Sequence, residues 1–163
     1  MEQHNRIGKH EYYLKLADIL SNRSTCLRRR YGAVIVKNDE VISTGYNGAP
    51  RGEENCIDIG TCIRQDMGVE HGERYELCNA VHAEANAIIS ASRRDMIGSC
   101  LYLSGRDAET GELIDAVPCT MCRRLIVNAG IEKLILMGDD GRYVECKVKG
   151  VKDAGENSRG DDC

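Results

Sequence analysis

The chain has 163 residues, a net charge of −4 and neither phenylalanine nor tryptophan. This length fits a single domain with a core large enough to fold without disulfides. The acidic balance excludes a protein that coats nucleic acid through a broad basic surface, so we expect no stable nucleic-acid binding. No run approaches 18 apolar residues, which excludes a membrane-spanning helix, and with no apolar leader we expect a cytoplasmic protein.

Cysteine is unusually frequent, with nine residues in the chain. A cytoplasmic protein keeps its thiols reduced, so these cysteines indicate metal ligands and buried side chains rather than a disulfide framework. They stand at Cys26, Cys56, Cys62, Cys78, Cys100, Cys119, Cys122, Cys146 and Cys163.

The first third of the chain predicts a helix followed by a hairpin. Apolar residues between positions 10 and 21 recur at spacings of three and four, which is typical of an amphipathic helix. Two β-rich runs at 32–36 and 41–47 flank the polar residues 38–40 and predict two paired strands. Residues 45–75 are punctuated by glycine and keep no period, so we expect a long loop that needs an additional source of order.

Two further helices are predicted in the second half. Residues 82–94 are rich in helix-forming side chains, and two arginines in the expected last turn suit the negative end of the helix dipole. Pro118 at a first helical position and Gly130 just past the end delimit the second helix. Between them, residues 105–117 are expected to form a polar loop.

Short apolar runs supply the remaining strands. Residues 99–104 and 133–137 predict buried strands, and residues 142–151 predict a weak edge strand. Helices that alternate with buried strands after an initial hairpin favour an α/β fold with three α/β/α layers and a mixed sheet. We expect one domain over residues 1–149 and a disordered polar tail over residues 150–163.

Two short motifs stand where the two later helices begin. The first is His82-Ala83-Glu84, and the second is Pro118-Cys119-Thr120-Met121-Cys122. Cys119 and Cys122 are three residues apart, so they share one helix face, and the positive end of a helix favours their thiolates. With His82 as a third ligand, one tetrahedral position stays open, which is typical of a catalytic zinc.

Glu84 is the candidate catalytic residue of this centre. Zinc lowers the pKa of bound water toward about 7, and a carboxylate near the metal but outside its ligand set can take the proton. It can then pass protons to a ring nitrogen and a leaving amine. The cysteine pair alone also fits a structural zinc knuckle or two buried thiols. The conjunction of H-x-E with P-C-x-x-C is the signature of zinc nucleobase deaminases.

Further stretches extend the likeness beyond the zinc motifs. They are the segments STCLR at 24–28, GAVIV at 32–36, GYNGAP at 45–50 and HAEANAI at 82–88, together with PCTMC at 118–122. With these the chain resembles the deoxycytidylate (dCMP) deaminase family of the zinc-dependent cytidine/deoxycytidylate deaminase superfamily, from about residue 14 to 136. The resemblance implies a cytidine-deaminase-like fold with a five-stranded mixed sheet. It also implies hydrolysis of dCMP to dUMP and ammonia in the supply of dTMP.

The resemblance also implies a role for each matching residue. His82, Cys119 and Cys122 would bind zinc, a zinc-bound hydroxide would attack C4 of the pyrimidine, and Glu84 would be the proton shuttle. The substrate-binding residues would be Asn47 at the deoxyribose, the Ala83 backbone at the pyrimidine and Arg28 at the 5′-phosphate.

Arg28 has a physical argument of its own. Residues 28–30 form the only run of three basic residues, and a guanidinium fork suits phosphate. The same run also fits a solvated basic turn.

Four of the other cysteines are candidates for a second, structural zinc. Cys26, Cys56, Cys62 and Cys78 lie in or beside the long loop, with His71 as a fifth candidate. Some members of the resembling family carry a second zinc here, and two of these cysteines fall at matching positions. A metal would order a loop with few apolar residues. Free, partly buried thiols are the alternative. Cys100 is expected in the core, and Cys146 and Cys163 have no assigned role.

The resemblance further implies a homo-hexamer with dCTP and dTTP as effectors, where Mg²⁺ would accompany the nucleotide. Two segments depart from the family pattern, the loop at 105–117 and the chain beyond Met137. Two alternatives stay open. One is a deaminase of another base, such as tRNA adenosine, cytosine, guanine or a pteridine- or flavin-like precursor. The other is a non-catalytic zinc-binding accessory protein, for which Glu84 would have no use.

Overall fold

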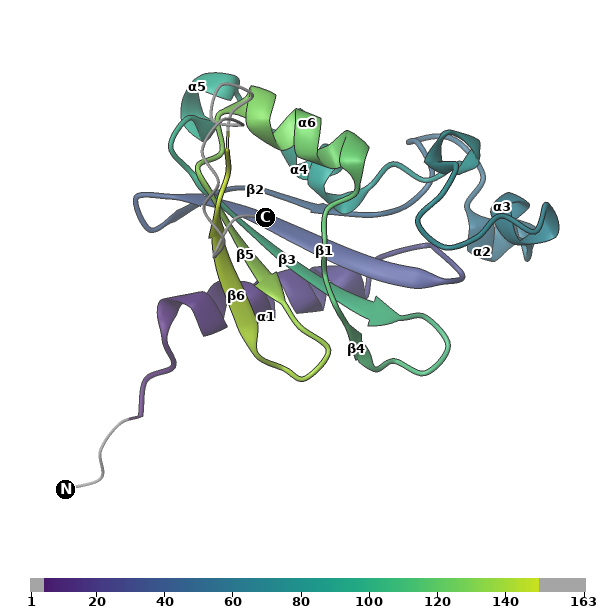
Figure 1. The fold of residues 1–163 in the computed structure, drawn as a ribbon, viewed down its shortest axis with the longest axis horizontal. Helices are drawn as coiled ribbons and strands as arrows, with labels where there is room; N and C mark the ends of the chain where they lie inside the picture. Colours follow the sequence, from purple (N-terminus) through teal and green to yellow (C-terminus); the bar gives the residue numbers. More distant parts are fainter. Residues whose placement is uncertain (1–4, 150–163) are drawn as a thin grey trace.

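A mixed β-sheet forms the centre of the computed structural model, which describes residues 5–149 (Figure 1). The strand order is β2-β1-β3-β5-β6, and the short β4 pairs with β3. Only β3 and β5 run parallel, while the other pairs are antiparallel. The strands are β1 (Arg29–Lys37), β2 (Glu40–Tyr46), β3 (Cys100–Asp107), β4 (Leu113–Ile114), β5 (Lys133–Met137) and β6 (Tyr143–Lys147).

Helices cover both faces of this sheet, which confirms the predicted three layers (Figure 1). One face carries α1 (Lys9–Ser21), and the other carries α4 (Ala83–Ile89), α5 (Arg93–Met96) and α6 (Thr120–Ala129). Three short turns of helix, α2 (Cys56–Ile59), α3 (Ile63–Asp66) and η1 (Tyr75–Leu77), lie beyond the end of the sheet where β1 begins. Over residues 5–149, no helix combines the length and apolarity needed to cross a bilayer.

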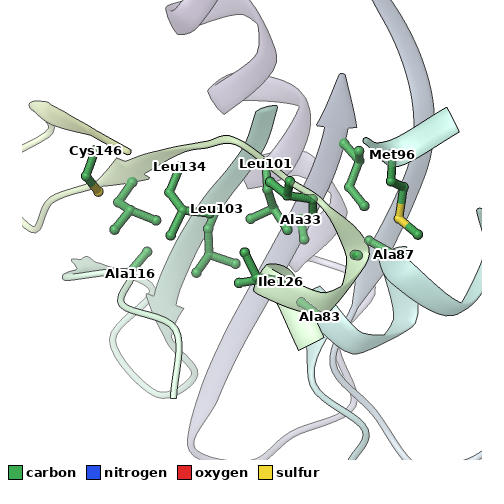
Figure 2. Packing of buried hydrophobic residues seen from close by; sticks show 14 residues of the cluster. Ala33, Ala83, Ala87, Met96, Leu101, Leu103, Ala116, Ile126, Leu134 and Cys146 are labelled. Atoms are coloured by element: carbon green, nitrogen blue, oxygen red, sulfur yellow. The ribbon is translucent and has the colours of Figure 1, made fainter. Parts of the chain in front are cut away.

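The core is aliphatic and splits into two clusters because side chains alternate along each strand. In β1, Ala33 and Ile35 belong to the cluster under α4 and α6, whereas Val34 and Val36 belong to the cluster under α1. Figure 2 shows the first cluster, in which Ile126 of α6 packs among the sheet side chains. Both later helices are therefore fixed to the sheet by their buried faces.

Gly45 brings α4 close to the sheet. A Cβ atom at this position would overlap the carbonyl oxygen of Ala83, so the backbones of β2 and α4 touch directly. Beside it, the hydroxyl of Ser43 donates a hydrogen bond to the carbonyl of Ala87 at 2.7 Å. These contacts fix the first turn of α4 relative to β1 and β2.

The prediction of one helix over 82–94 is wrong. Helix α4 ends at Ile89, where the Ser90 hydroxyl bonds back to the Asn86 carbonyl. Ser92 then caps a separate helix by accepting the Arg94 amide, so both arginines stand at a helix start rather than in a last turn. Two serines within three residues, Ser90 and Ser92, favour caps over a continuous helix.

Pro118 is not the first helical residue. Helix α6 begins at Thr120, and Cys119 is its N-cap residue, with its Sγ accepting the amide of Cys122. Pro118 therefore precedes the cap. Gly130 ends the helix as predicted, with a positive φ of 80°.

The segment 105–117 is more ordered than a polar loop. Strand β3 continues to Asp107, and Leu113–Ile114 returns beside it as β4. The Asp107 carboxylate accepts the amides of Glu109 and Thr110, which closes the turn between the two strands. The predicted edge strand is confirmed over Tyr143–Lys147, and buried Cys146 joins the core there. The predicted tail at 150–163, with Cys163, lies outside the described residues.

Candidate active site

The three predicted metal ligands meet at the starts of α4 and α6. His82 is the N-cap residue of α4, and Cys119 is the N-cap residue of α6. The Nδ1 atom of His82 lies 3.4 Å from the Sγ atoms of both Cys119 and Cys122. Over residues 5–149, this is the one group of three or more such side chains whose ligand atoms all lie within 4.8 Å of one another.

This geometry fits a tetrahedral zinc ion. Zinc–sulfur bonds of about 2.3 Å and zinc–nitrogen bonds of about 2.0 Å separate the ligand nitrogen and sulfur by roughly 3.6 Å. The two observed separations of 3.4 Å are close to that value. Three protein ligands leave a fourth position open to water or substrate.

The two thiols differ in their affinity for a proton. A hydrogen bond from Cys122, then contact with His82, lowers the pKa of Cys119 to about 4. Cys122 is the donor to Cys119 and is buried, so its own pKa is raised. The Cys119 thiolate in turn raises the pKa of His82. Because metal ligands must be deprotonated, metal binding would displace the proton that the two thiols share.

Glu84 lies beside this group but is not part of it. The residue is only 5% exposed and stands in the first turn of α4, two positions after His82. Burial raises the pKa of its carboxyl group. A carboxyl group whose affinity for a proton is raised by burial, next to a metal site, is suited to general acid–base chemistry.

A pocket of about 700 Å³, including its mouth, opens onto Glu84, His82 and Cys119. Side chains from β1, from the end of β2 and from the loop between β2 and α4 also line it. They include Arg28, Tyr31, Asn47, Arg64, His71 and Tyr75.

Two of the three predicted substrate residues line this pocket. Arg28 does so with its Nη1 atom buried and without a hydrogen-bond partner among the described residues. The Asn47 amide is already engaged, because its Oδ1 accepts the Tyr31 amide at 2.8 Å and its Nδ2 donates to the Arg29 carbonyl at 2.9 Å. Ala83 is fully buried, and its sequence neighbours His82 and Glu84 both line the pocket. The substrate contacts of all three residues stay predictions.

The four cysteines of the predicted second zinc lie near one another without forming a compact group. Cys26, Cys62 and Cys78 line the pocket, and His71 lines it as well. Burial raises the pKa of Cys56, and the other three thiols add to that shift, so all four are neighbours. Within residues 5–149, no three of these sulfurs lie within 4.8 Å of one another. The second zinc therefore stays a prediction.

Sequence reasoning missed two side chains of this pocket. The Tyr75 ring meets the imidazole of His82 edge-on, with 5.0 Å between ring centroids. The Arg64 guanidinium lies over the Tyr75 ring, with its Cζ atom 4.4 Å from the ring centre. Both stand in the irregular loop, where no periodicity marks a residue as buried. The aromatic surfaces available to a bound base are thus tyrosines and histidines.

Comparison with known protein families identifies a matching family model. The family model for the cytidine and deoxycytidylate deaminase zinc-binding region matches residues 7–138. This range includes His82, Glu84, Cys119 and Cys122.

Similar proteins agree with this match. A protein named deoxycytidylate deaminase from Mycobacterium phage D29 is 38% identical over 130 residues, which is 77% of this chain and 91% of that protein. A deoxycytidylate deaminase of Saccharomyces cerevisiae is 37% identical over 144 residues, 88% of this chain but 42% of that protein. This chain thus spans less than half of the yeast protein.

Solved structures share the fold. The dCMP deaminase from cyanophage S-TIM5, in complex with dCMP and dUMP, is 27% identical with a TM-score of 0.54, covering 79% of this chain and 82% of that chain. A cytidine deaminase from Burkholderia pseudomallei has a TM-score of 0.55 at 17% identity, covering 86% and 94% of the two chains. The second likeness concerns the fold alone.

Proposed function

Because the chain belongs to the cytidine and deoxycytidylate deaminase family, we propose that it hydrolyses dCMP to dUMP and ammonia. The observation that carries this proposal is the arrangement at one pocket of His82, Cys119 and Cys122 with the buried carboxyl of Glu84. The relatives named deoxycytidylate deaminase support the choice of substrate.

His82, Cys119 and Cys122 are the residues that would hold zinc. Bound there, zinc would act as a Lewis acid and lower the pKa of water to make hydroxide available at neutral pH. The thiolate of Cys119 and the imidazole Nδ1 of His82 supply ligand atoms on two helices that are packed against the sheet. This placement fixes the attacking water relative to the pocket.

Glu84 moves the protons of the reaction. Its carboxylate takes the proton released by water as oxygen adds to C4 of cytosine. It delivers this proton to N3, then takes the proton of the new C4 hydroxyl group and delivers it to the departing amino group, so that ammonia leaves and a uracil ring remains. Burial of the side chain excludes bulk water from these transfers.

Arg28 would bind the 5′-phosphate, because its buried Nη1 has no hydrogen-bond partner among the described residues. Asn47 would contact the deoxyribose with the remaining amide hydrogen of its Nδ2, since the other amide groups hold the start of β1. The backbone of Ala83 would contact the pyrimidine between the ligand His82 and the carboxyl of Glu84.

The direct test is the product of the wild-type chain loaded with zinc. Incubation with dCMP should release ammonia and dUMP in a 1:1 ratio, as measured by an ammonia assay and by chromatography. Absence of both products would contradict the proposal. Release of ammonia only from tRNA adenosine, cytosine, guanine or a pteridine precursor would assign another deaminase. Zinc binding without turnover of any of these substrates would assign an accessory protein.

A second, structural zinc on Cys26, Cys56, Cys62 and Cys78 belongs to the same proposal. The support is that these four thiols gather around a loop in which, from residue 51 to residue 80, only Cys62 and Arg64 are buried. Metal analysis should find two zinc ions per chain. Cys56→Ser should reduce this to one, while Cys100→Ser, in β3, should keep both. One zinc in the wild-type chain would contradict the second site.

Assembly, regulation and location are proposed from the family resemblance alone. We expect a cytoplasmic homo-hexamer whose activity rises with dCTP, bound with Mg²⁺, and falls with dTTP. Light scattering and activity assays with each nucleotide test these expectations. A monomer that is insensitive to both nucleotides would contradict them.

A further inference from the structure

Arg64 is an unusual residue for its place in the chain. It belongs to the four-residue helix α3 in the loop beyond the sheet, yet it is only 6% exposed. Cys62 is the one other buried residue between positions 51 and 80. A buried arginine is expected to have an acidic partner, because an unpaired buried charge is costly. Within residues 5–149, no carboxylate forms an ion pair with Arg64.

The guanidinium of Arg64 is held in place by uncharged groups. Its Nη2 atom donates hydrogen bonds to the carbonyls of Glu70 and Glu73. Its Cζ atom lies 4.4 Å from the centre of the Tyr75 ring, a distance typical of a cation–π contact. These contacts fix the position of the group, but none of them neutralises its charge.

One edge of this guanidinium has no partner. The Nε atom of Arg64 is buried and lacks a hydrogen-bond acceptor in the described structure, and the same holds for Nη1 of Arg28. Leaving a buried donor unsatisfied costs free energy. Both side chains line the pocket that opens onto Glu84. Two arginines from separate segments, each with an unsatisfied buried donor, therefore line one pocket.

The pocket lining gathers further cationic side chains. Arg29 lines it beside Arg28 and Arg64. An anion that enters the pocket would therefore meet several cations before it reaches the buried carboxyl of Glu84.

We propose that Arg64 is a second phosphate ligand, which with Arg28 binds the 5′-phosphate of the substrate and makes the enzyme prefer the nucleotide to its nucleoside. This inference rests on the proposed function. A phosphate monoester carries up to two negative charges and has three terminal oxygens, so it can accept hydrogen bonds from two guanidinium groups at once. The bound nucleotide would supply the missing counter-charge of Arg64.

The test compares dCMP with deoxycytidine, which lacks the phosphate but has the same reacting ring. Arg64→Gln removes the charge and keeps an amide that can reach the loop carbonyls. Arg64→Lys keeps the charge without the Nε donor. Arg74→Gln is the matched control, because it removes an exposed arginine of the same loop whose partner is Glu76. Zinc content and thermal unfolding are measured for each variant.

With Arg64→Gln, kcat/KM for dCMP should fall at least about 30-fold, while kcat/KM for deoxycytidine should stay within about threefold. Arg64→Lys should lose less on dCMP, and Arg74→Gln should leave both substrates unchanged. Equal losses on the two substrates, or no loss on dCMP, would overturn the inference, since Arg64 would then only hold Tyr75 beside His82.

If Arg64→Gln fails to fold, the ratio of kcat/KM for dCMP to that for deoxycytidine is measured for Arg64→Lys instead, and an unchanged ratio would overturn the inference. A wild-type chain inactive on dCMP would contradict the proposed function instead, and binding of dUMP against deoxyuridine would then test Arg64.

Discussion

The two sides of the pocket are built in opposite ways. His82, Glu84, Cys119 and Cys122 stand on the first turns of helices whose other residues, such as Ala87 and Ile126, are packed against the sheet. Arg64, His71 and Tyr75 stand in a loop with only two buried residues and three very short helices. The first side is ordered by apolar packing, and the second by hydrogen bonds and ring contacts.

The difference separates chemistry from recognition. Metal ligands and a proton carrier need their atoms held within about 0.5 Å, which packed helices provide. Phosphate recognition depends more on charge than on such precision, so it can reside on a loop. The loop side would then gain further order from the proposed substrate and the proposed second zinc.

Removal of the Glu84 carboxylate should have the largest effect on the chemical side. Glu84→Gln should lower kcat for dCMP at least about 10³-fold, because the proton carrier is lost. The zinc content should not change, since Glu84 lies outside the three-ligand group. An ultraviolet assay with metal analysis measures both quantities. The exposed Glu76→Gln is the control, and substantial residual turnover in Glu84→Gln would remove this residue from the mechanism.

A change at the contact between α4 and the sheet should have the next largest effect. Gly45→Ala would push a methyl group into the Ala83 carbonyl, which is backbone and cannot easily move. We expect the free energy of unfolding to fall by about 2 kcal/mol or more, as for other overpacked sites. Denaturant unfolding measures this loss. Gly8→Ala, whose Cβ meets no atom within 4 Å, is the control. Equal stability of the two variants would contradict direct α4–β2 contact.

Metal removal should affect the two sides of the pocket to different extents. Treatment with a chelator should speed hydrogen exchange of the loop amides at residues 56–68 at least about tenfold, because the second zinc orders a segment with little packing. The amides of Ile35 and Leu103 in the sheet should change little. Mass-spectrometric exchange resolves both regions. Equal changes in loop and sheet, or no change in the loop, would contradict this division.

The smallest effect concerns Asp39, far from the pocket. Hydrogen bonds from Lys9 and then Tyr13 lower the pKa of this carboxyl group. Its stabilising contribution is therefore present above the unfolded pKa of about 3.9 and is lost as pH falls through the lower folded value. The Tm of the wild-type chain should exceed that of Asp39→Asn at pH 7, and the difference should shrink as the pH falls below the unfolded pKa of about 3.9. A difference that stays constant as the pH falls would contradict this ion pair.

The contrast between the packed helices and the loop explains which features the sequence could predict. The candidate metal ligands and Glu84 can be predicted because H-x-E and P-C-x-x-C place particular side chains at helix starts, and α4 and α6 do begin there. The strands were identified because apolar residues alternate between two buried faces. Both signals depend on local spacing, so they survive without knowledge of the tertiary structure.

Other features depend on contacts that have no local signal. Arg64 is buried because it bonds to two backbone carbonyls and stacks on Tyr75, and no residue spacing encodes those contacts. The break between α4 and α5 depends on Ser90 and Ser92, which bond to the backbone where helix propensity alone would continue the helix.

The most direct measurement is deamination by the wild-type, zinc-loaded chain across dCMP, CMP, dCTP, deoxycytidine and cytosine. In this account the packed helices perform the chemistry and the basic loop binds one phosphate. We therefore expect dCMP to be the best substrate, with kcat/KM at least about 30-fold above that for deoxycytidine. Equal turnover of dCMP and deoxycytidine, or no turnover of either, would contradict the account.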